Sequence, residues 1–273
     1  MTWWQALLLG LVQGLTEFLP VSSSGHLMIC KELFGVDAEG FLDFTVLVHF
    51  GTVLSTLVVF WGVIWNLLKG LFKFRYNDET DYVCKLIVSM IPVAVVGFFF
   101  KDYVEGLFGN SLVVVGVCLL VTAALLFFSD VASGPRGWTG TNVHRNGISY
   151  LQAFLVGIGQ ACAVAPGLSR SGTTIATGLM TGVRRDVMAQ FSFLMVLVPI
   201  LGEQLLDIVK NVSETGSFFS GAVSPVCLVL GFLTAFLSGL FACKVMIALV
   251  KKARLSWFAL YCVLAAILVF ILA

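Results

Sequence analysis

Two short polar runs in an otherwise apolar chain carry residue types that act on phosphate groups. PVSSSGHL, residues 20–27, places three serines, a glycine and a histidine together, and PGLSRSGTT, residues 166–174, adds an arginine to a second set of hydroxyls. Hydroxyls and free backbone N–H groups can surround an anion, and a helix that begins at such a turn adds a partial positive charge. A guanidinium grips phosphate oxygens bidentately and stays charged when buried. The inventory therefore favours phosphate or pyrophosphate over a sugar, an amino acid or a bare metal ion.

Acid–base groups accompany the first run. Gln13 and Glu17 are four residues apart, so they share one face of a helix that Pro20 then ends. An ionisable residue inside a membrane segment is costly and is by default a functional candidate. His26 titrates near neutrality and can move a proton. We therefore expect Glu17 and His26 to act beside the serines.

Either run alone has a second interpretation, because serine and glycine in membrane helices often only allow close packing. Repetition of the runs favours a site, as does Arg170, which needs an anionic partner inside a membrane. We interpret His49, in an apolar run, as a hydrogen-bonded core residue and His144, in a polar loop, as solvated. Glu203 and Asp207 share a helix face late in a span; they either line a polar cavity or anchor the outer end of the span, and we favour the anchor.

The elements that position these runs must lie in a membrane. Of the 273 residues, 59% are hydrophobic and 11% charged, whereas a soluble domain carries about 25% charged residues. The net charge of +1 and the lack of a basic run give no indication of a nucleic-acid partner. The seven cysteines are scattered singly, which predicts buried apolar side chains and neither disulfides nor a metal site. The N-terminus lacks the basic region and cleavage site of a signal peptide, so we expect it in the mature fold.

The sequence predicts an all-α integral membrane protein with six transmembrane helices and two re-entrant helix-loop-helix segments. A span needs about 20 apolar residues, and the re-entrant segments are each interrupted midway by Pro, Gly and Ser. The predicted spans are residues 42–68, 84–100, 111–129, 187–209, 222–249 and 256–273, and the interrupted segments are 3–30 and 150–182.

The two halves of the chain repeat. QALLLGLVQ, residues 5–13, matches QAFLVGIGQ, residues 152–160, at an offset of 147. Each half has one interrupted segment and three spans, so the second half enters the membrane in the opposite orientation, as in an inverted-topology repeat whose interrupted helices meet near the midplane. We predict a single membrane domain, 1–273, made of half 1–130, a cytoplasmic connector 131–149 and half 150–273.

Lysine and arginine residues gather on one side of this arrangement. Loops 69–85, 130–149, 183–186 and 250–255 hold 11 of the 16, and the opposite side holds 3. Because such loops face the cytoplasm, we expect both termini on the outer face.

The run QGLTEFLPVSSSGHL, followed by PGLSRSGTT in the second half, closely resembles the undecaprenyl-diphosphatase family of bacteria, the bacitracin-resistance protein type. The resemblance covers essentially the whole chain. It implies hydrolysis of undecaprenyl diphosphate to undecaprenyl phosphate and inorganic phosphate, which recycles the lipid carrier for peptidoglycan and other cell-wall polymers and confers bacitracin resistance. It also implies a bacterial plasma (inner) membrane location, with the active site opening to the outer face.

Family roles transfer by position. Many members have glutamate where this chain has Gln13, which leaves Glu17 as the only acid of its motif. The family is aided by Mg²⁺ or Ca²⁺, which Glu17 would hold largely through substrate phosphates and waters. The catalytic residues expected are Glu17, Ser23, His26 and Arg170, and the substrate-binding residues are Gln13, Ser22, Ser24, Gly25, Ser169, Ser171, Gly172 and Thr173.

In the expected mechanism Arg170 clamps the phosphates. Ser23 is the nucleophile, with Ser22 second, and His26 is the general base or acid. Glu17 orients His26 or holds the metal. In a variant, water attacks directly and the serines only bind.

The sequence also bears on functions other than hydrolysis. Phosphatidic acid phosphatases also carry Ser-Gly-His, but the histidine of their SRx5H run is absent after Ser169-Arg170. A transporter or flippase for a phospholipid or small anion is the rival, because inverted repeats with broken helices are common in transporters. Pure anion transport needs no proton donor such as His26. A structural role would not require Arg170 in the bilayer. The expected partners are a polyprenyl diphosphate and the bilayer, with the chain acting as a monomer or a homodimer.

Overall fold

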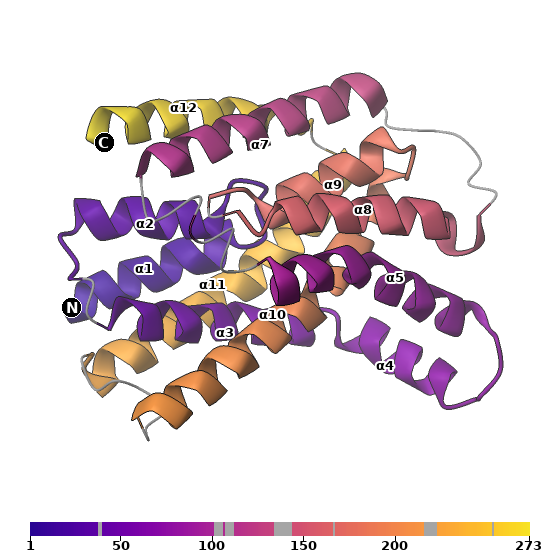
Figure 1. The fold of residues 1–273 in the computed structure, drawn as a ribbon, viewed down its shortest axis with the longest axis horizontal. Helices are drawn as coiled ribbons and strands as arrows, with labels where there is room; N and C mark the ends of the chain where they lie inside the picture. The colour runs from indigo at the N-terminus through magenta and orange to yellow at the C-terminus, as the bar shows by residue number, and fades with distance from the viewer. Residues whose placement is uncertain are drawn as a thin grey trace.

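The computed structural model describes residues 1–37, 40–100, 106, 112–133, 144–165, 167–215, 223–252 and 254–273, with the side chains of 203, 204, 206–208, 210–215, 251 and 252 excepted. In this part of the chain all regular secondary structure is helical, and there is no strand (Figure 1). Its elements are α1 (Trp3–Thr16), α2 (Ser23–Leu33), α3 (Phe41–Val59), α4 (Trp61–Leu71), α5 (Asp78–Phe99), α7 (Leu112–Ser133), a 3₁₀ turn (Arg145–Gly147), α8 (Tyr150–Cys162), α9 (Arg170–Met180), α10 (Arg185–Thr215), α11 (Pro225–Lys252) and α12 (Ser256–Leu272).

Five helices of the described part are long and apolar enough to cross a membrane, namely α3, α5, α7, α10 and α11. The sixth predicted span, 256–273, is α12, a shorter apolar helix of 17 residues. At about 1.5 Å per residue it reaches nearly the thickness of a hydrocarbon core. The chain is therefore a multi-pass membrane protein, and both of its ends lie at the same end of the molecule (Figure 1).

The predicted span 42–68 is not one helix. Helix α3 ends at Val59 and a separate helix, α4, begins at Trp61 after a break at Phe60. Beyond the break α4 continues away from α3, and α5 returns alongside it (Figure 1). Gly70 of α4 lies against the Glu79 side chain, and its carbonyl accepts from Asn77 Nδ2 at 2.9 Å. No proline marks this break, and Gly62 just after it is the one residue of low helix propensity nearby, so the packing of α4 on α5 also contributes to it.

Each interrupted segment forms a helical hairpin, which we call hairpin 1 (α1 and α2) and hairpin 2 (α8 and α9). Helix α1 packs on α11 and α8 packs on α5, so each hairpin leans on a helix from the other half of the chain. The contacts are close. A Cβ on Gly10 would lie 2.4 Å from the Gly231 carbonyl oxygen, and one on Gly157 would lie 2.2 Å from the Ser89 carbonyl oxygen. Glycine permits this backbone approach.

Charges from the loops predicted to be cytoplasmic meet in pairs at one end of the molecule. Lys85 Nζ lies 2.6 Å from Asp81 Oδ2 and donates to the Arg145 carbonyl at 2.7 Å. Arg185 bonds Asp130 at 2.5 Å, and the other oxygen of Asp130 accepts from the first backbone N–H of α12 at 2.7 Å. Lys101 and Arg136 lie outside the described residues, as do the side chains of Lys210, Lys251, Lys252, Glu203 and Asp207.

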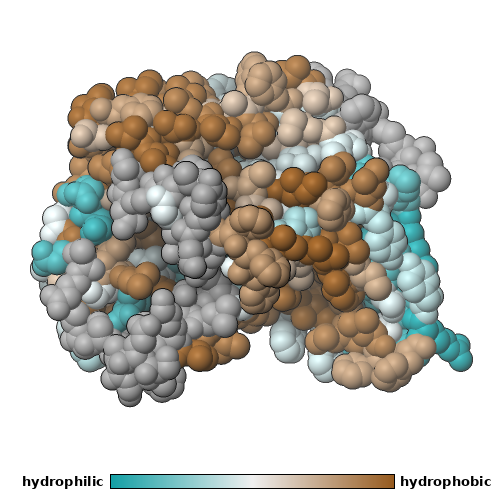
Figure 2. Space-filling model, in the orientation of Figure 1, coloured by the Kyte–Doolittle hydropathy of each residue, from teal (hydrophilic) through white to brown (hydrophobic). Residues whose placement is uncertain are grey.

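Apolar side chains cover the flanks of the molecule between two more polar ends (Figure 2). Exposed examples come from several helices, among them Phe98, Phe128, Leu237 and Trp257. A soluble protein rarely exposes such continuous apolar surface. These flanks are the surface that faces lipid.

Candidate active site

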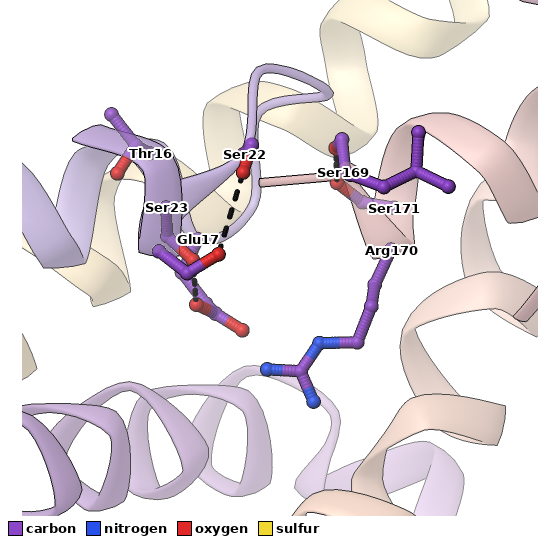
Figure 3. Close-up of a pocket in the computed structure, with 9 residues that line it drawn as sticks. Thr16, Glu17, Ser22, Ser23, Ser169, Arg170 and Ser171 are labelled. Carbon is purple, nitrogen blue, oxygen red and sulfur yellow. Dashed lines mark hydrogen bonds between the residues drawn. The ribbon is translucent and has the colours of Figure 1, made fainter. Parts of the chain in front are cut away.

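The tips of the two hairpins meet at one polar hollow of about 260 Å³ (Figure 3). The Ser171 hydroxyl of hairpin 2 donates to the Leu19 carbonyl of hairpin 1 at 3.1 Å, which joins the tips directly. Residues from both hairpins line the hollow: Thr16, Glu17, Ser22, Ser23, Ser24, Leu168, Ser169, Arg170 and Ser171. Seven of the residues predicted from the sequence are thus brought together, although hairpin 1 and hairpin 2 are far apart in the chain.

The same cap begins the second helix of each hairpin. Ser22 Oγ accepts from the Gly25 N–H at 3.2 Å, and Ser169 Oγ accepts from the Gly172 N–H at 3.1 Å. Serine at this position satisfies one of the free N–H groups at a helix start. Both helix N-termini therefore lie at the hollow, where their dipoles and remaining N–H groups favour an anion.

Helix α7 supports both caps from behind. Its Thr122 hydroxyl accepts from the Ser169 N–H at 3.2 Å, and its Val115 lies against both Gly25 and Gly167. Gly167 has a φ of +90°, a conformation that side chains with a Cβ rarely adopt. Glycine at these points lets the tips sit directly on α7.

Glu17 lies at the end of α1 and faces the start of α2. Its Oε2 accepts from the Ser23 hydroxyl at 2.6 Å and from Gln13 Nε2 at 2.8 Å. A serine hydroxyl so close to a carboxylate has a base ready to take its proton. Gln13 is fully buried and, as a donor, holds the carboxylate in place.

Arg170 is the first residue of α9 and projects along the hollow from the hairpin 2 side. Its guanidinium and the Glu17 carboxylate point toward one another across the open space (Figure 3). The arrangement offers a fixed cation on one wall and a carboxylate with its serine on the other. An anion between them would contact the cation, the hydroxyls and two helix starts together.

A second hollow, of about 420 Å³, continues from the first and shares Glu17, Arg170 and Ser171 with it. The rest of its wall is mainly apolar and comes from the hairpin 1 tip, α3 and α10. Thr52 and Thr56 are polar by type, but their hydroxyls donate to carbonyls of their own helix at 2.7 and 3.0 Å. The apolar part of the wall is Phe18, Val53, Phe193, Val196, Leu197 and Ile200.

His26 is not among the residues that line either hollow. Its Nδ1 lies 2.7 Å from the Ser22 carbonyl oxygen, and its Nε2 lies 2.7 Å from the hydroxyl of Tyr261 on α12. The centroids of the two rings are 5.6 Å apart, and the angle between the ring planes is 8°. Glu17 accepts a hydrogen bond from the Ser23 hydroxyl, and the hydrogen bonds of His26 go to Ser22 and Tyr261. These contacts do not include the expected one in which Glu17 orients His26.

Several residues at or near the site were not predicted: Thr16 and Leu168 line the first hollow, and Tyr261 and His49 lie close to it. Tyr261 gave no signal, because an aromatic residue in an apolar span is unremarkable in sequence. His49 Nε2 lies 3.7 Å from Glu17 Oε2, and its Nδ1 bonds the Thr45 carbonyl at 2.8 Å. Thr45, His49, Thr52 and Thr56 recur at helical spacing and form a polar stripe in an apolar segment, a signal that the interpretation of His49 as a core residue overlooked.

The remaining predicted residues lie just behind the hollow. Gly25 and Gly172 carry the capped N–H groups, and Thr173 donates to the Ser169 carbonyl at 2.8 Å. Gln13 supports Glu17 and leaves its Oε1 buried without a hydrogen-bond partner. Among the described residues no three His, Cys, Asp or Glu side chains cluster as a metal site. The oxygens of Glu17 and Gln13 are nonetheless of the kind that Mg²⁺ and Ca²⁺ prefer.

Comparison with known proteins yields one family and many relatives. The family model for the bacitracin resistance protein BacA matches residues 6–268. An undecaprenyl-diphosphatase of Bacteroides thetaiotaomicron is 54% identical over 271 residues, covering 99% of both chains. An undecaprenyl-diphosphatase of Parabacteroides distasonis is 54% identical and covers 98% of this chain and 97% of its own. One of Halothermothrix orenii is 35% identical, with 98% and 97% covered.

Proposed function

The chain belongs to the bacitracin resistance protein BacA family, and on that premise we propose that it hydrolyses undecaprenyl diphosphate to undecaprenyl phosphate and inorganic phosphate. This activity recycles the lipid carrier of cell-wall synthesis and supports bacitracin resistance. The observation that carries the proposal is the shared hollow, in which Ser23 and Glu17 of one hairpin face Arg170 of the other. Family membership favours hydrolysis over the rival transporter function.

In the proposed reaction Ser23 Oγ attacks the terminal phosphorus and its proton passes to Glu17, to which it is already bonded at 2.6 Å. The bond from that phosphorus to the bridging oxygen breaks, and the electron pair leaves with the polyprenyl phosphate. Water then attacks the phosphoserine, Ser23 Oγ recovers the proton from Glu17, and both hydrogens of the water stay with inorganic phosphate. Direct attack by water held at Glu17 is the alternative, and the short Ser23–Glu17 bond favours the serine.

Arg170 and the starts of α2 and α9 stabilise the charge on the transferred phosphoryl group. Electrostatic stabilisation of this kind dominates phosphoryl transfer. A divalent cation is a further proposal. The carboxylate of Glu17 and the unpartnered Oε1 of Gln13 would hold it together with phosphate oxygens, and it would neutralise negative charge on the diphosphate.

The second hollow takes the first part of the lipid tail. In a polyprenyl diphosphate the carbon chain is bonded directly to the phosphate group, so a head in the first hollow places the first isoprene units beside Arg170 and Ser171, where the second hollow begins. Its wall of Phe18, Phe193 and Ile200, with threonine hydroxyls occupied within their helix, suits hydrocarbon. Polar and apolar hollows in series match an amphipathic substrate.

The proposed topology has six spans and two re-entrant hairpins, related as inverted repeats. It rests on the repeated caps, on the two ends of the chain lying together, and on the pairing of loop charges at the other end. In a bacterial plasma (inner) membrane this topology would have the termini on the outer face, and we propose that the site opens to that face as well.

Phosphate release from a polyprenyl diphosphate by the purified protein in detergent tests the function. Detergent removes compartments, so a transporter would release none. Ser23→Ala is the companion variant: we expect it to abolish release and the wild type to yield a phosphoserine on rapid acid quench. A wild-type protein that binds the lipid but releases no phosphate would refute hydrolysis.

A further inference from the structure

We propose that His26 and Tyr261 are positioning residues: together they fix the backbone carbonyl of Ser22 and thereby aim Ser23 at Glu17, and His26 transfers no proton. The inference rests on the proposed hydrolysis, because its readout is turnover. It assigns a role to a residue of α12, an element that contributes nothing to either hollow.

The hydrogen bonds of His26 determine its tautomer. The Ser22 carbonyl can only accept, so the Nδ1 that lies 2.7 Å from it carries a proton. In the neutral ring Nε2 is then an acceptor, and the Tyr261 hydroxyl at 2.7 Å donates to it. Both nitrogens are occupied, the ring is nine-tenths buried, and the Tyr261 ring lies nearly parallel to it and offset, with 5.6 Å between the ring centroids. No nitrogen is left to receive the proton of Ser23, which is bonded to Glu17.

The second repeat performs the same task without a histidine. At the offset of 147, Thr173 corresponds to His26 and Ser169 to Ser22. Thr173 donates to the Ser169 carbonyl twice, from its hydroxyl at 2.8 Å and from its N–H at 2.9 Å. His26 likewise donates to the Ser22 carbonyl twice, from Nδ1 and from its N–H at 3.2 Å. Threonine has no acid–base function here, so holding this carbonyl is the task common to both repeats.

Hairpin 1 needs the additional support because its cap is strained. Ser22 has a φ of +69°, in the region that favours glycine, whereas Ser169 has an ordinary φ of −71°. The Ser22 carbonyl belongs to the peptide plane that precedes Ser23, so its direction sets where the Ser23 side chain points. Helix α12 braces the same tip with two adjacent residues: Tyr261 holds His26, and Cys262 Sγ lies 3.7 Å from the Pro20 carbonyl oxygen.

The repeat itself supplies the test. His26→Thr installs the residue that the second repeat uses, and His26→Val is its matched control, with the same shape and no hydroxyl. A displacement near 1 Å at a reacting group costs about 100-fold in rate. We therefore expect His26→Val to lower kcat by about 100-fold with little change in KM, and His26→Thr to recover at least tenfold of that loss. Tyr261→Phe keeps the ring and loses one neutral hydrogen bond, so kcat should fall about fivefold.

The outcomes separate the possibilities. If His26 were a general base, Thr and Val would be equally inactive, and equal rates at position 26 would overturn the proposal. A fully active His26→Val would overturn it as well. Thermal unfolding in detergent checks that both variants fold; if they do not, Tyr261→Phe decides, and an unchanged kcat refutes the positioning pair. Failure of the proposed function is a different result, since the wild type would then release no phosphate.

Discussion

Replacing Arg170 is the most direct perturbation of the site. Arg170→Ala removes the cation that faces Glu17 across the hollow but leaves the starts of α2 and α9 and the serine hydroxyls in place. A phosphoryl-clamping arginine contributes about 10³–10⁵ in kcat, equivalent to about 4–7 kcal/mol of transition-state stabilisation. We expect a loss of that size, mostly in kcat, because the charge on the phosphoryl oxygens is redistributed as the bond to the bridging oxygen breaks. Arg170→Lys keeps the charge without the planar fork and should fall between alanine and wild type.

Initial rates of phosphate release at varied concentrations of polyprenyl diphosphate separate kcat from KM. Arg184→Ala is the matched control: it removes the same charge from an exposed site, where Arg184 pairs with Asp186 outside both hollows. Its rate should equal that of the wild type. Thermal unfolding in detergent confirms that Arg170→Ala folds, since the side chain ends in an open hollow and alanine suits a helix start. Near-normal phosphate release by folded Arg170→Ala would refute the assignment of Arg170 as the phosphate clamp, and with it a catalytic contribution from hairpin 2.

Two further predictions concern the tail hollow and the packing of the hairpins. Ile200→Trp should fill part of the second hollow and raise KM for a polyprenyl diphosphate about 30-fold, because excluding two or three carbons of the tail costs about 2 kcal/mol of binding free energy. Val198→Trp, on the lipid-exposed face of the same helix, is the control and should leave KM unchanged. Equal KM values for the two variants would show that the tail binds elsewhere. Gly157→Ala should lower the free energy of unfolding by about 1–3 kcal/mol through overpacking against Ser89, and thermal unfolding should show Gly62→Ala, whose Cβ meets nothing within 4 Å, to be no less stable than wild type.

The features that depend on short stretches of sequence, namely the two hairpins, their serine caps and Glu17, could be predicted from the sequence. The hairpins could be found because Pro, Gly and Ser interrupt apolar runs at matching places, and the meeting of their tips followed from the repeat. Serine at 22 and 169 indicated helix starts for the same reason that it caps them in the structure. Glu17 could be predicted because a carboxylate in a membrane segment is energetically costly without a partner, and because it shares a helix face with Gln13.

Contacts between distant elements could not be predicted from such patterns. His26 and Tyr261 are 235 residues apart, and nothing in either segment indicates that α12 lies against hairpin 1. The break at Phe60 depends on α4 finding α5. His49 carried a signal in the polar stripe of its helix, but its proximity to Glu17 depends on how α3 packs beside α1. Residue type suggested a role for His26 as a base, and only the geometry of both nitrogens argues for another.

The repeat explains why one pocket can hold both an acid–base pair and a cation. Ser23 and Arg170 are equivalent residues, each the first of its helix at an offset of 147, and Glu17 corresponds to Val164. Two identical tips would put either two carboxylates or two guanidinium groups into a single hollow, and like charges at such a distance oppose each other. Both hairpins have a serine cap and a hydrogen-bonded carbonyl before the second helix, and these shared features form an anion site. The hairpins differ in their catalytic residues, because hairpin 1 carries the nucleophile and base and hairpin 2 carries the arginine clamp. The carboxylate of Glu17 and the guanidinium of Arg170 thereby nearly balance each other before the substrate arrives. The excess negative charge of a diphosphate is left to the two helix starts and to the proposed divalent cation.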